Sequence, residues 1–154
     1  MKVRVEISND GEDEEIVIRC RNADDRVRRL EKLLTDELAP PSLLRFFKGD
    51  GAEKAEFFFS TDEVLFFETD GDAVFAHTTS DAFKTEMRLY ELEAVLPSHF
   101  VRVSKSSLVN IRRIYSIRRN LTGASPVQFY ASHKIVYVSR LYYKDLRRFL
   151  GRGE

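Results

Sequence analysis

Two stretches near the start of the chain alternate apolar and polar residues. Residues 3–7 and residues 16–20 each carry an apolar side chain at every second position, and the turn-forming Asn9-Asp10-Gly11 lies between them. A period of two places the apolar side chains on one face of an extended segment. The pattern therefore predicts two strands joined by an acidic loop.

A helical period replaces this alternation after residue 22. The apolar positions are Val27, Leu30, Leu33, Leu34 and Leu38. Their spacing of three or four residues is typical of a helix with one apolar face, which Asn22 is expected to cap and Pro40-Pro41 to end. We therefore expect residues 1–45 to form a small β-β-α segment that serves packing or dimerisation.

Short strands rich in phenylalanine are predicted in the middle of the chain. The expected strands cover residues 43–47, 56–59, 64–68, 73–77 and 83–87. Asp70-Gly71 is the strongest hairpin signal among their connections, because a two-residue turn of this kind matches the twist of the flanking strands. A short amphipathic helix over residues 89–96 is expected to end at Pro97.

The last third of the chain returns to strand patterns and ends in a helix. Strands are expected over residues 100–103, 111–117, 127–130 and 135–138, and the inner face of the final helix is expected to carry Leu141, Leu146, Phe149 and Leu150. The predicted fold is mainly β with short helices, an α+β class, and residues 46–154 are expected to form its main domain.

The predicted strand over residues 100–103 leads into a polar loop. Arg102 stands between two valines and is expected on the opposite face of that strand. Residues 104–106 then place two serine hydroxyls around Lys105, and the apolar residues 108–109 return the chain to the core. Hydroxyl and ammonium groups at the end of a strand can reach a phosphate or a base edge, so this loop is the first candidate site.

The formal net charge is zero, but the charges are divided unevenly along the chain. Residues 100–154 contain 12 basic and two acidic side chains, a net charge of +10, whereas residues 1–99 contain 13 basic and 23 acidic ones, a net charge of −10. Such a division favours a half that binds a polyanion beside an acidic half that limits non-specific binding. It points to a nucleic-acid-binding face more than to ordinary solvated charge.

Composition narrows the remaining classes. Cys20 is the only cysteine, which excludes a disulfide framework and a C-x-x-C metal site, and the three histidines are dispersed without ligand spacing. The N-terminus lacks the basic tip and apolar run of a signal peptide, and no stretch approaches a membrane-spanning length. We therefore expect a cytoplasmic protein that uses no metal and no other cofactor.

Four motifs, in order, carry a resemblance to a known family. They are VLFFET at residues 64–69, LYELE followed by LP at 89–97, FVRVSKS followed by VN at 100–110, and VSRLY at 138–142. Together they resemble the successive signatures of the LytTR-type DNA-binding domain. The resemblance implies an elongated, mostly β fold whose loops enter adjacent major grooves of double-stranded DNA. It also implies bacterial transcription regulation, often by a homodimer or by paired protomers on repeated half-sites.

The segment that precedes the resembling region suggests how this chain differs from many relatives. Many relatives of this type carry a phosphoacceptor receiver domain, as response regulators do. The segment before residue 45 is too short to form a receiver domain. The resemblance therefore implies a stand-alone transcriptional regulator.

Family roles can be carried over at matching positions. The loop around Lys105 matches the principal base-reading loop, where many members have His-Arg or His-Asn; lysine can donate to a guanine edge but lacks the bidentate fork. The segment after Ser139 matches the second contact region, and the turn at residues 70–72 matches the first contact loop but is acidic here. The candidate DNA-binding residues are Arg102, Ser104, Lys105, Ser106, Arg112, Arg113, Arg140 and Lys144.

The arginines of residues 112–119 require a separate interpretation. Arg112, Arg113, Arg118 and Arg119 are expected to position phosphates or to solvate the surface, and none of the four is expected to read bases.

Two other functions must be weighed against DNA reading. Ser104 beside Lys105 could act as a nucleophile and base, but adjacent residues of a strand point to opposite faces, and phosphate-binding and nucleophile-elbow motifs are absent from the sequence. We therefore expect no enzyme. A non-enzymatic protein- or RNA-interaction module could use the same basic face, with exposed tyrosines such as Tyr130 and Tyr137 stacking on bases.

Overall fold

The computed structural model describes residue 5, residues 15–38 and residues 43–151. Its helices are α1 (Asp25–Leu38), α2 (Leu89–Val95) and α3 (Arg140–Leu150). Its strands are β1 (Leu43–Lys48), β2 (Ala55–Ser60), β3 (Phe66–Asp70), β4 (Ala73–His77), β5 (Ala82–Thr85), β6 (Phe100–Ser104), β7 (Ser107–Asn110), β8 (Ile114–Ile117), β9 (Ser125–Phe129) and β10 (Ile135–Val138).

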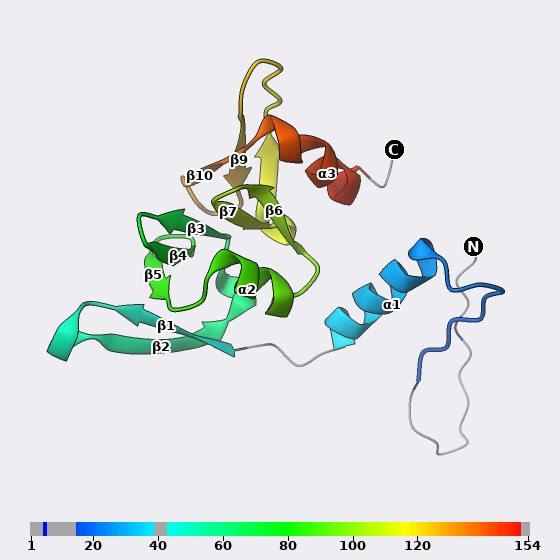
Figure 1. Ribbon diagram of the computed structural model, residues 1–154, viewed down its shortest axis with the longest axis horizontal. Coiled ribbons are helices and arrows are strands. Elements are labelled where there is room, and N and C mark those ends of the chain that lie inside the picture. The colour runs from blue at the N-terminus through cyan, green and yellow to red at the C-terminus, as the bar shows by residue number, and fades with distance from the viewer. Residues whose placement is uncertain (1–4, 6–14, 39–42, 152–154) are drawn as a thin grey trace.

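Two antiparallel sheets organise these strands. The larger has seven strands in the order β2-β1-β5-β4-β3-β7-β6, and the smaller has three in the order β10-β9-β8. Figure 1 shows the β1–β2 hairpin and the smaller sheet toward opposite ends of the molecule, with the β3–β5 meander between them. The expectation of an α+β fold that is mainly β is confirmed.

The hairpin predicted at Asp70-Gly71 is present. Asp70 pairs with Ala73 at the end of β3 and β4, and Gly71 adopts a φ of 62°. The two loop residues are therefore Gly71 and Asp72, and the steric cost of this left-handed region for a side chain explains glycine at the first of them.

The core has two hydrophobic clusters, one within the larger sheet and one between the two sheets. One cluster is built on Phe46, Phe67 and Leu108 under helix α2, and the other on Val103, Val127 and Leu146 under helix α3. All six of these side chains are fully buried. Burying side chains of this size stabilises the fold by about 1.5–3 kcal/mol each relative to exposure, so the two clusters fix the strand ends where the candidate loops lie.

The expectations for the first segment are only partly met. Residues 15–20 form no strand, although a strand was predicted over residues 16–20, and Ile16 and Val17 are exposed, with no strand of the described residues beside them. The strand expected over residues 3–7 falls largely outside the described residues. Helix α1 is present, but its cap is Asp24, whose Oδ1 accepts from the Val27 N–H at 3.0 Å, and not Asn22.

Two expectations for single elements also change. β3 begins at Phe66 and not at residue 64, because the Val64 N–H closes a 3₁₀ turn with Thr61. In helix α3 only Leu146 of the expected inner residues is fully buried, and Leu141 is 78% exposed. β1 spans the domain boundary expected at residue 45 and pairs with β5 inside the larger sheet.

Within the described ranges, no helix is both long and apolar enough to cross a membrane.

Candidate nucleic-acid interface

The polar loop of residues 104–106 forms a tight turn between β6 and β7. Ser104 pairs with Ser107, and a bulge between Arg102 and Ser104 bends the strand just before the turn. Ser104 Oγ accepts from the Ser106 N–H at 3.1 Å, which fixes the turn locally. Lys105 and Ser106 are exposed, so the ammonium group of Lys105 stands at the tip of a short, rigid connection.

The side chain of Arg102 stabilises this turn. Its Nε donates to the Ser104 carbonyl at 2.7 Å and its Nη2 to the Lys105 carbonyl at 2.5 Å, while Nη1 pairs with Glu93 Oε1 at 2.9 Å. The side chain is only 25% exposed. The guanidinium group is thus directed at the turn itself, and Lys105 is the cation that the turn presents to solvent.

A strand of the meander is tied to the same turn. The Thr69 N–H donates to the Ser106 carbonyl at 2.9 Å, so the acidic β3–β4 turn lies close to Lys105. Beside it, burial raises the pKa of Glu68, partly offset by a hydrogen bond with Ser107, and the nearby Asp70 raises it further. The negative charge here would oppose a phosphate.

Helix α3 begins at the same end of the molecule. The Ser139 N–H donates to the Val103 carbonyl at 2.8 Å, which fastens the residue before α3 to the end of β6. Arg140 and Lys144 follow on the first turns of α3, and both are exposed. The structure therefore brings Ser104, Lys105, Ser106 and Arg140 to one end of the strands, with Lys144 one helical turn further along.

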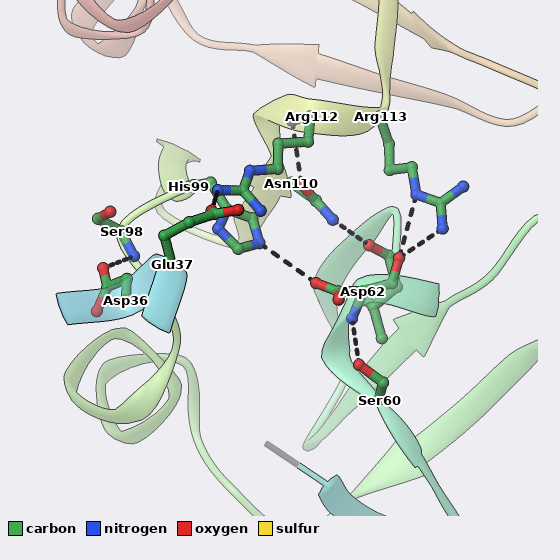
Figure 2. Close-up of polar contacts among 10 residues, drawn as sticks. Asp36, Glu37, Ser60, Asp62, Ser98, His99, Asn110, Arg112 and Arg113 are labelled. Carbon is green, nitrogen blue, oxygen red and sulfur yellow. Dashed lines mark hydrogen bonds and ion pairs between the residues drawn. The ribbon is translucent and has the colours of Figure 1, made fainter. Parts of the chain in front are cut away.

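Arg112 and Arg113 lie at the other end of β7 (Figure 2). Arg112 Nη2 pairs with Glu37 Oε2 of helix α1 at 2.6 Å, and Arg113 donates from Nε and Nη2 to the Asp62 carbonyl at 3.1 and 2.7 Å. β7 is four residues long, which separates its ends by roughly 10–13 Å. The structure does not bring these two arginines together with Lys105.

Asn110 explains the geometry at this second end. It is 1% exposed, its Nδ2 donates to the Val64 carbonyl at 3.1 Å, and its Oδ1 accepts from the Arg112 N–H at 3.0 Å. Beside it, His99 is buried with no hydrogen-bond partner for Nε2, which lies 3.8 Å from Asp62 Oδ1 (Figure 2). Burial lowers the pKa of His99, and the positive charge of Arg112 lowers it further.

Arg119 also belongs to this interface, although the sequence did not distinguish it from the other three arginines of residues 112–119. Arg119 and Arg140 line the same surface hollow between the β8–β9 loop and helix α3. The feature that separates Arg119 from its neighbours is a contact with Tyr143 on α3, whose ring lies 5.0 Å from the Arg119 guanidinium, and no local sequence pattern signals this contact.

The described ranges contain no group of three or more His, Cys, Asp or Glu side chains that could hold a metal ion.

The family comparison assigns this two-sheet β scaffold, whose strand-end loops carry cations, to a class of DNA-binding domains. The sequence profile of the LytTr DNA-binding domain matches residues 54–151, and this chain belongs to that family. The resemblance noted in the four motifs is thereby confirmed.

Relatives and a solved structure agree with this assignment. An HTH-type transcriptional regulator of Staphylococcus aureus strain NCTC 8325 is 35% identical over 88 residues, which cover 57% of this chain and 59% of the relative. A second one, from the bovine strain RF122, is 36% identical over 85 residues, 55% of this chain and 57% of the relative. The LytTr DNA-binding domain of a Bacillus cereus protein superposes with a TM-score of 0.63 at 21% identity, over 73% of this chain and 99% of that domain.

The similarity to the solved structure and the similarity to the relatives support different conclusions. The solved structure, at 21% identity, shows the fold alone, and the chain spans about 59% of the first relative's length. In the described part of this chain strands separate the three helices from one another, so no two of them form a helix-turn-helix.

Proposed function

We propose that this protein is a sequence-specific regulator of transcription that binds double-stranded DNA through loops of its β scaffold. The observation that carries the proposal is the exposed Lys105 on a turn whose two carbonyl groups are held by Arg102. A preorganised cation loses little conformational entropy on binding, so it can discriminate between base edges.

The proposed division of labour follows from position and exposure. Lys105 and Arg140 read base edges in the major groove, and Arg140 can do so with a bidentate fork. Ser104 and Ser106 shape the turn and supply hydroxyls, and Lys144 contacts phosphate. Arg102 acts through the turn.

Arg112 and Arg113 take a smaller part in the proposal than the sequence suggested. Both already have partners on the protein, at Glu37 and at the Asp62 carbonyl. We assign them to phosphate attraction at most, and to holding the domain together.

The charge division supports attraction at long range. The net charge of +10 over residues 100–154 favours docking on any duplex, and the resulting affinity falls steeply as salt rises. The domain is proposed to work in the bacterial cytoplasm, as a homodimer or as paired protomers on repeated half-sites, with no cofactor and no catalytic step.

The test begins with selection of bound sequences from random duplexes by the full chain. Lys105→Ala is then expected to reduce the preference for the selected site over random duplex by about 1–3 kcal/mol for each lost base contact. The dissociation constants of the wild type and of Lys105→Ala, on the selected duplex and on the random duplex, are measured by fluorescence anisotropy at one salt concentration.

Two results would contradict the proposal. An equal loss on both duplexes would reduce Lys105 to a phosphate contact. If single-stranded poly-uridine competes as well as the selected duplex does, the protein is an RNA-interaction module and the DNA-reading proposal is wrong.

A further inference from the structure

A second basic surface lies beside the proposed base-reading loops. It is an open hollow of about 660 Å³ lined by Ile117, Arg119, Tyr143, Lys144 and Arg147. The neighbouring hollow is lined by Arg119, Asn120, Leu121, Gly123, Ser125, Arg140, Leu141 and Tyr143. Among the residues that the structure describes, neither hollow is lined by an aspartate or a glutamate, although acidic side chains are as numerous as basic ones in the whole chain.

Arg119 is held in place at the border of the two hollows. Its guanidinium carbon lies 5.0 Å from the centre of the Tyr143 ring, within the range of a cation–π interaction. Tyr143 is itself half-buried against the cluster under helix α3. The ring therefore forms a fixed platform that restricts the Arg119 side chain, and Arg119 itself lines both hollows.

The other arginines near this surface differ from Arg119. Arg118 lines neither hollow. Arg148 lies 3.8 Å from Asp145 and faces the groove on the α1 side of α3. Arg119 combines hollows whose described lining residues include no acid, a stacking partner, and a position between Arg140 and Lys144.

We infer that this surface is a phosphate-binding site for the backbone of duplex DNA, and that Arg119 on its Tyr143 platform is the residue that anchors it. The inference rests on the proposed function and extends it, because it assigns a sequence-independent contact to a residue outside the base-reading loops. An arginine held in one orientation can present its fork to a phosphate, with Lys144 adding a second positive charge.

A random-sequence 30-base-pair duplex is the appropriate probe, since a phosphate contact requires no operator. The full chain, Arg119→Gln and the matched control Arg118→Gln are titrated with this duplex at 50 mM and 200 mM salt. One phosphate contact fewer is expected to make the loss of affinity between these salt concentrations about three-fold smaller for Arg119→Gln than for the wild type. Arg118→Gln is expected to change this ratio little.

The platform is tested with two substitutions of Tyr143. Tyr143→Phe keeps the ring and is expected to bind the duplex like the wild type, whereas Tyr143→Leu removes the ring and is expected to weaken binding in the same direction as Arg119→Gln. Because Tyr143 packs against a core cluster, thermal melting of each variant is measured alongside binding. Arg119 is exposed, so Arg119→Gln is expected to fold like the wild type.

The outcomes separate the inference from the proposed function. If the wild type does not bind the duplex even at 50 mM salt, DNA binding and this site are both wrong. If it binds but Arg119→Gln and Arg118→Gln behave alike, only the phosphate site is wrong. An affinity loss confined to the selected operator would make Arg119 a base reader and would also overturn the inference.

Discussion

Three donor nitrogens of the Arg102 guanidinium group, Nε, Nη1 and Nη2, each contact an acceptor on the protein itself. Two of these hydrogen bonds end on carbonyl oxygens of the β6–β7 turn, and the third contact is an ion pair with Glu93. Lysine has no planar fork and cannot reproduce this set of contacts. A residue that sequence reasoning treated as a DNA-facing cation is therefore better understood as the support of Lys105.

Arg102→Lys is expected to lower the preference for the selected operator several-fold while leaving affinity for random duplex almost unchanged. The positive charge is retained, but the turn carbonyls lose their bidentate support. Glu93→Gln serves as the control, because it leaves both carbonyl contacts in place and is expected to have the smaller effect. Anisotropy titrations on the two duplexes measure the difference, and a uniform loss for Arg102→Lys would show a direct phosphate contact instead.

His77 is a second residue whose surroundings fix its protonation state. Its ring stacks on Phe66 with centroids 4.4 Å apart, and Lys134 Nζ lies 3.2 Å from Nδ1. Burial and the charge of Lys134 lower the pKa of His77 to about 4. Lys134 also donates to the Asp81 carbonyl, and Lys48 pairs with the Asp81 carboxylate, so the cation beside the ring is part of a wider polar network.

This pKa shift predicts a pH dependence of stability. In the unfolded chain His77 takes up a proton near pH 6.5, whereas the folded protein resists protonation until about pH 4. The unfolded state therefore binds more protons in this window, and stability is expected to fall as pH drops from about 6.5 to about 4.

His77→Phe retains the ring on Phe66 and removes the titrating group. Melting temperatures of the wild type and the variant between pH 4 and pH 7 should diverge, with the flatter profile in the variant. The lowered pKa of His99 also makes stability fall at low pH, but His99 is present in the wild type and in the variant alike. Superimposable profiles would contradict the assignment.

At the scale of elements, helix α1 is fastened to the domain by its acidic end (Figure 2). Asp36 Oδ2 accepts from the Ser98 N–H at 2.8 Å, and Glu37 pairs with Arg112. Burial opposes ionisation of Asp36, but the bonds from Ser98 and the positive charge of Lys32 outweigh it and place its pKa below the ordinary value. The exposed Glu37–Arg112 pair contributes at most about 1 kcal/mol.

Asp36→Ala is expected to loosen α1 more than Glu37→Gln does. The first change leaves the Ser98 N–H without its acceptor, at a cost of about 1 kcal/mol, or roughly five-fold faster exchange of the α1 amide hydrogens. Hydrogen–deuterium exchange resolved by mass spectrometry measures this, with Glu31→Ala as a control on the same helix. Equal protection in Asp36→Ala and Glu31→Ala would show that α1 is held by its apolar face alone.

The elements differ in how far local sequence determined them. The β3–β4 hairpin was predictable because Asp70-Gly71 fixes the turn and Phe67 and Val74 fix the buried faces. The strand expected over residues 16–20 shows the opposite case, because alternation alone does not create a partner strand. Helix α1 was predicted from its period. Its cap at Asp24 was not, because asparagine at position 22 and aspartate at position 24 are equally good capping residues.

On the scale of the whole molecule, Phe66 joins the two sheets. It belongs to β3 of the larger sheet, is 3% exposed, and stacks at 5.4 Å on Phe129 of β9 in the smaller sheet. The hydrogen bond from the Ser139 N–H to Val103 links the sheets a second time. These contacts favour cooperative unfolding of both sheets.

Phe66→Ala is expected to lower the free energy of unfolding by about 3–5 kcal/mol, and Phe58→Ala by far less, because Phe58 is 63% exposed. Urea unfolding followed by circular dichroism and by tyrosine fluorescence measures both variants. Two separate transitions in the wild type would contradict the view that the sheets unfold together.

The candidate site was predictable to a similar extent. Exposure of Lys105 and Arg140 followed from strand and helix ends that the pattern located well. The pairing of Arg112 with Glu37 was not predictable, because the two residues are 75 positions apart and meet only through the docking of α1. Arg119 was missed for the same reason, since its partner Tyr143 belongs to a helix that follows two further strands.

The contacts that hold the β6–β7 turn have one property with a practical consequence. Arg102 and Thr69 bind main-chain oxygens of residues 104–106, so the backbone of the tip keeps its shape whichever amino acid occupies position 105. Evolution can exchange that amino acid, and so change the target sequence, without rebuilding the scaffold. A library randomised at positions 105 and 140 should accordingly yield folded proteins with altered operator choice.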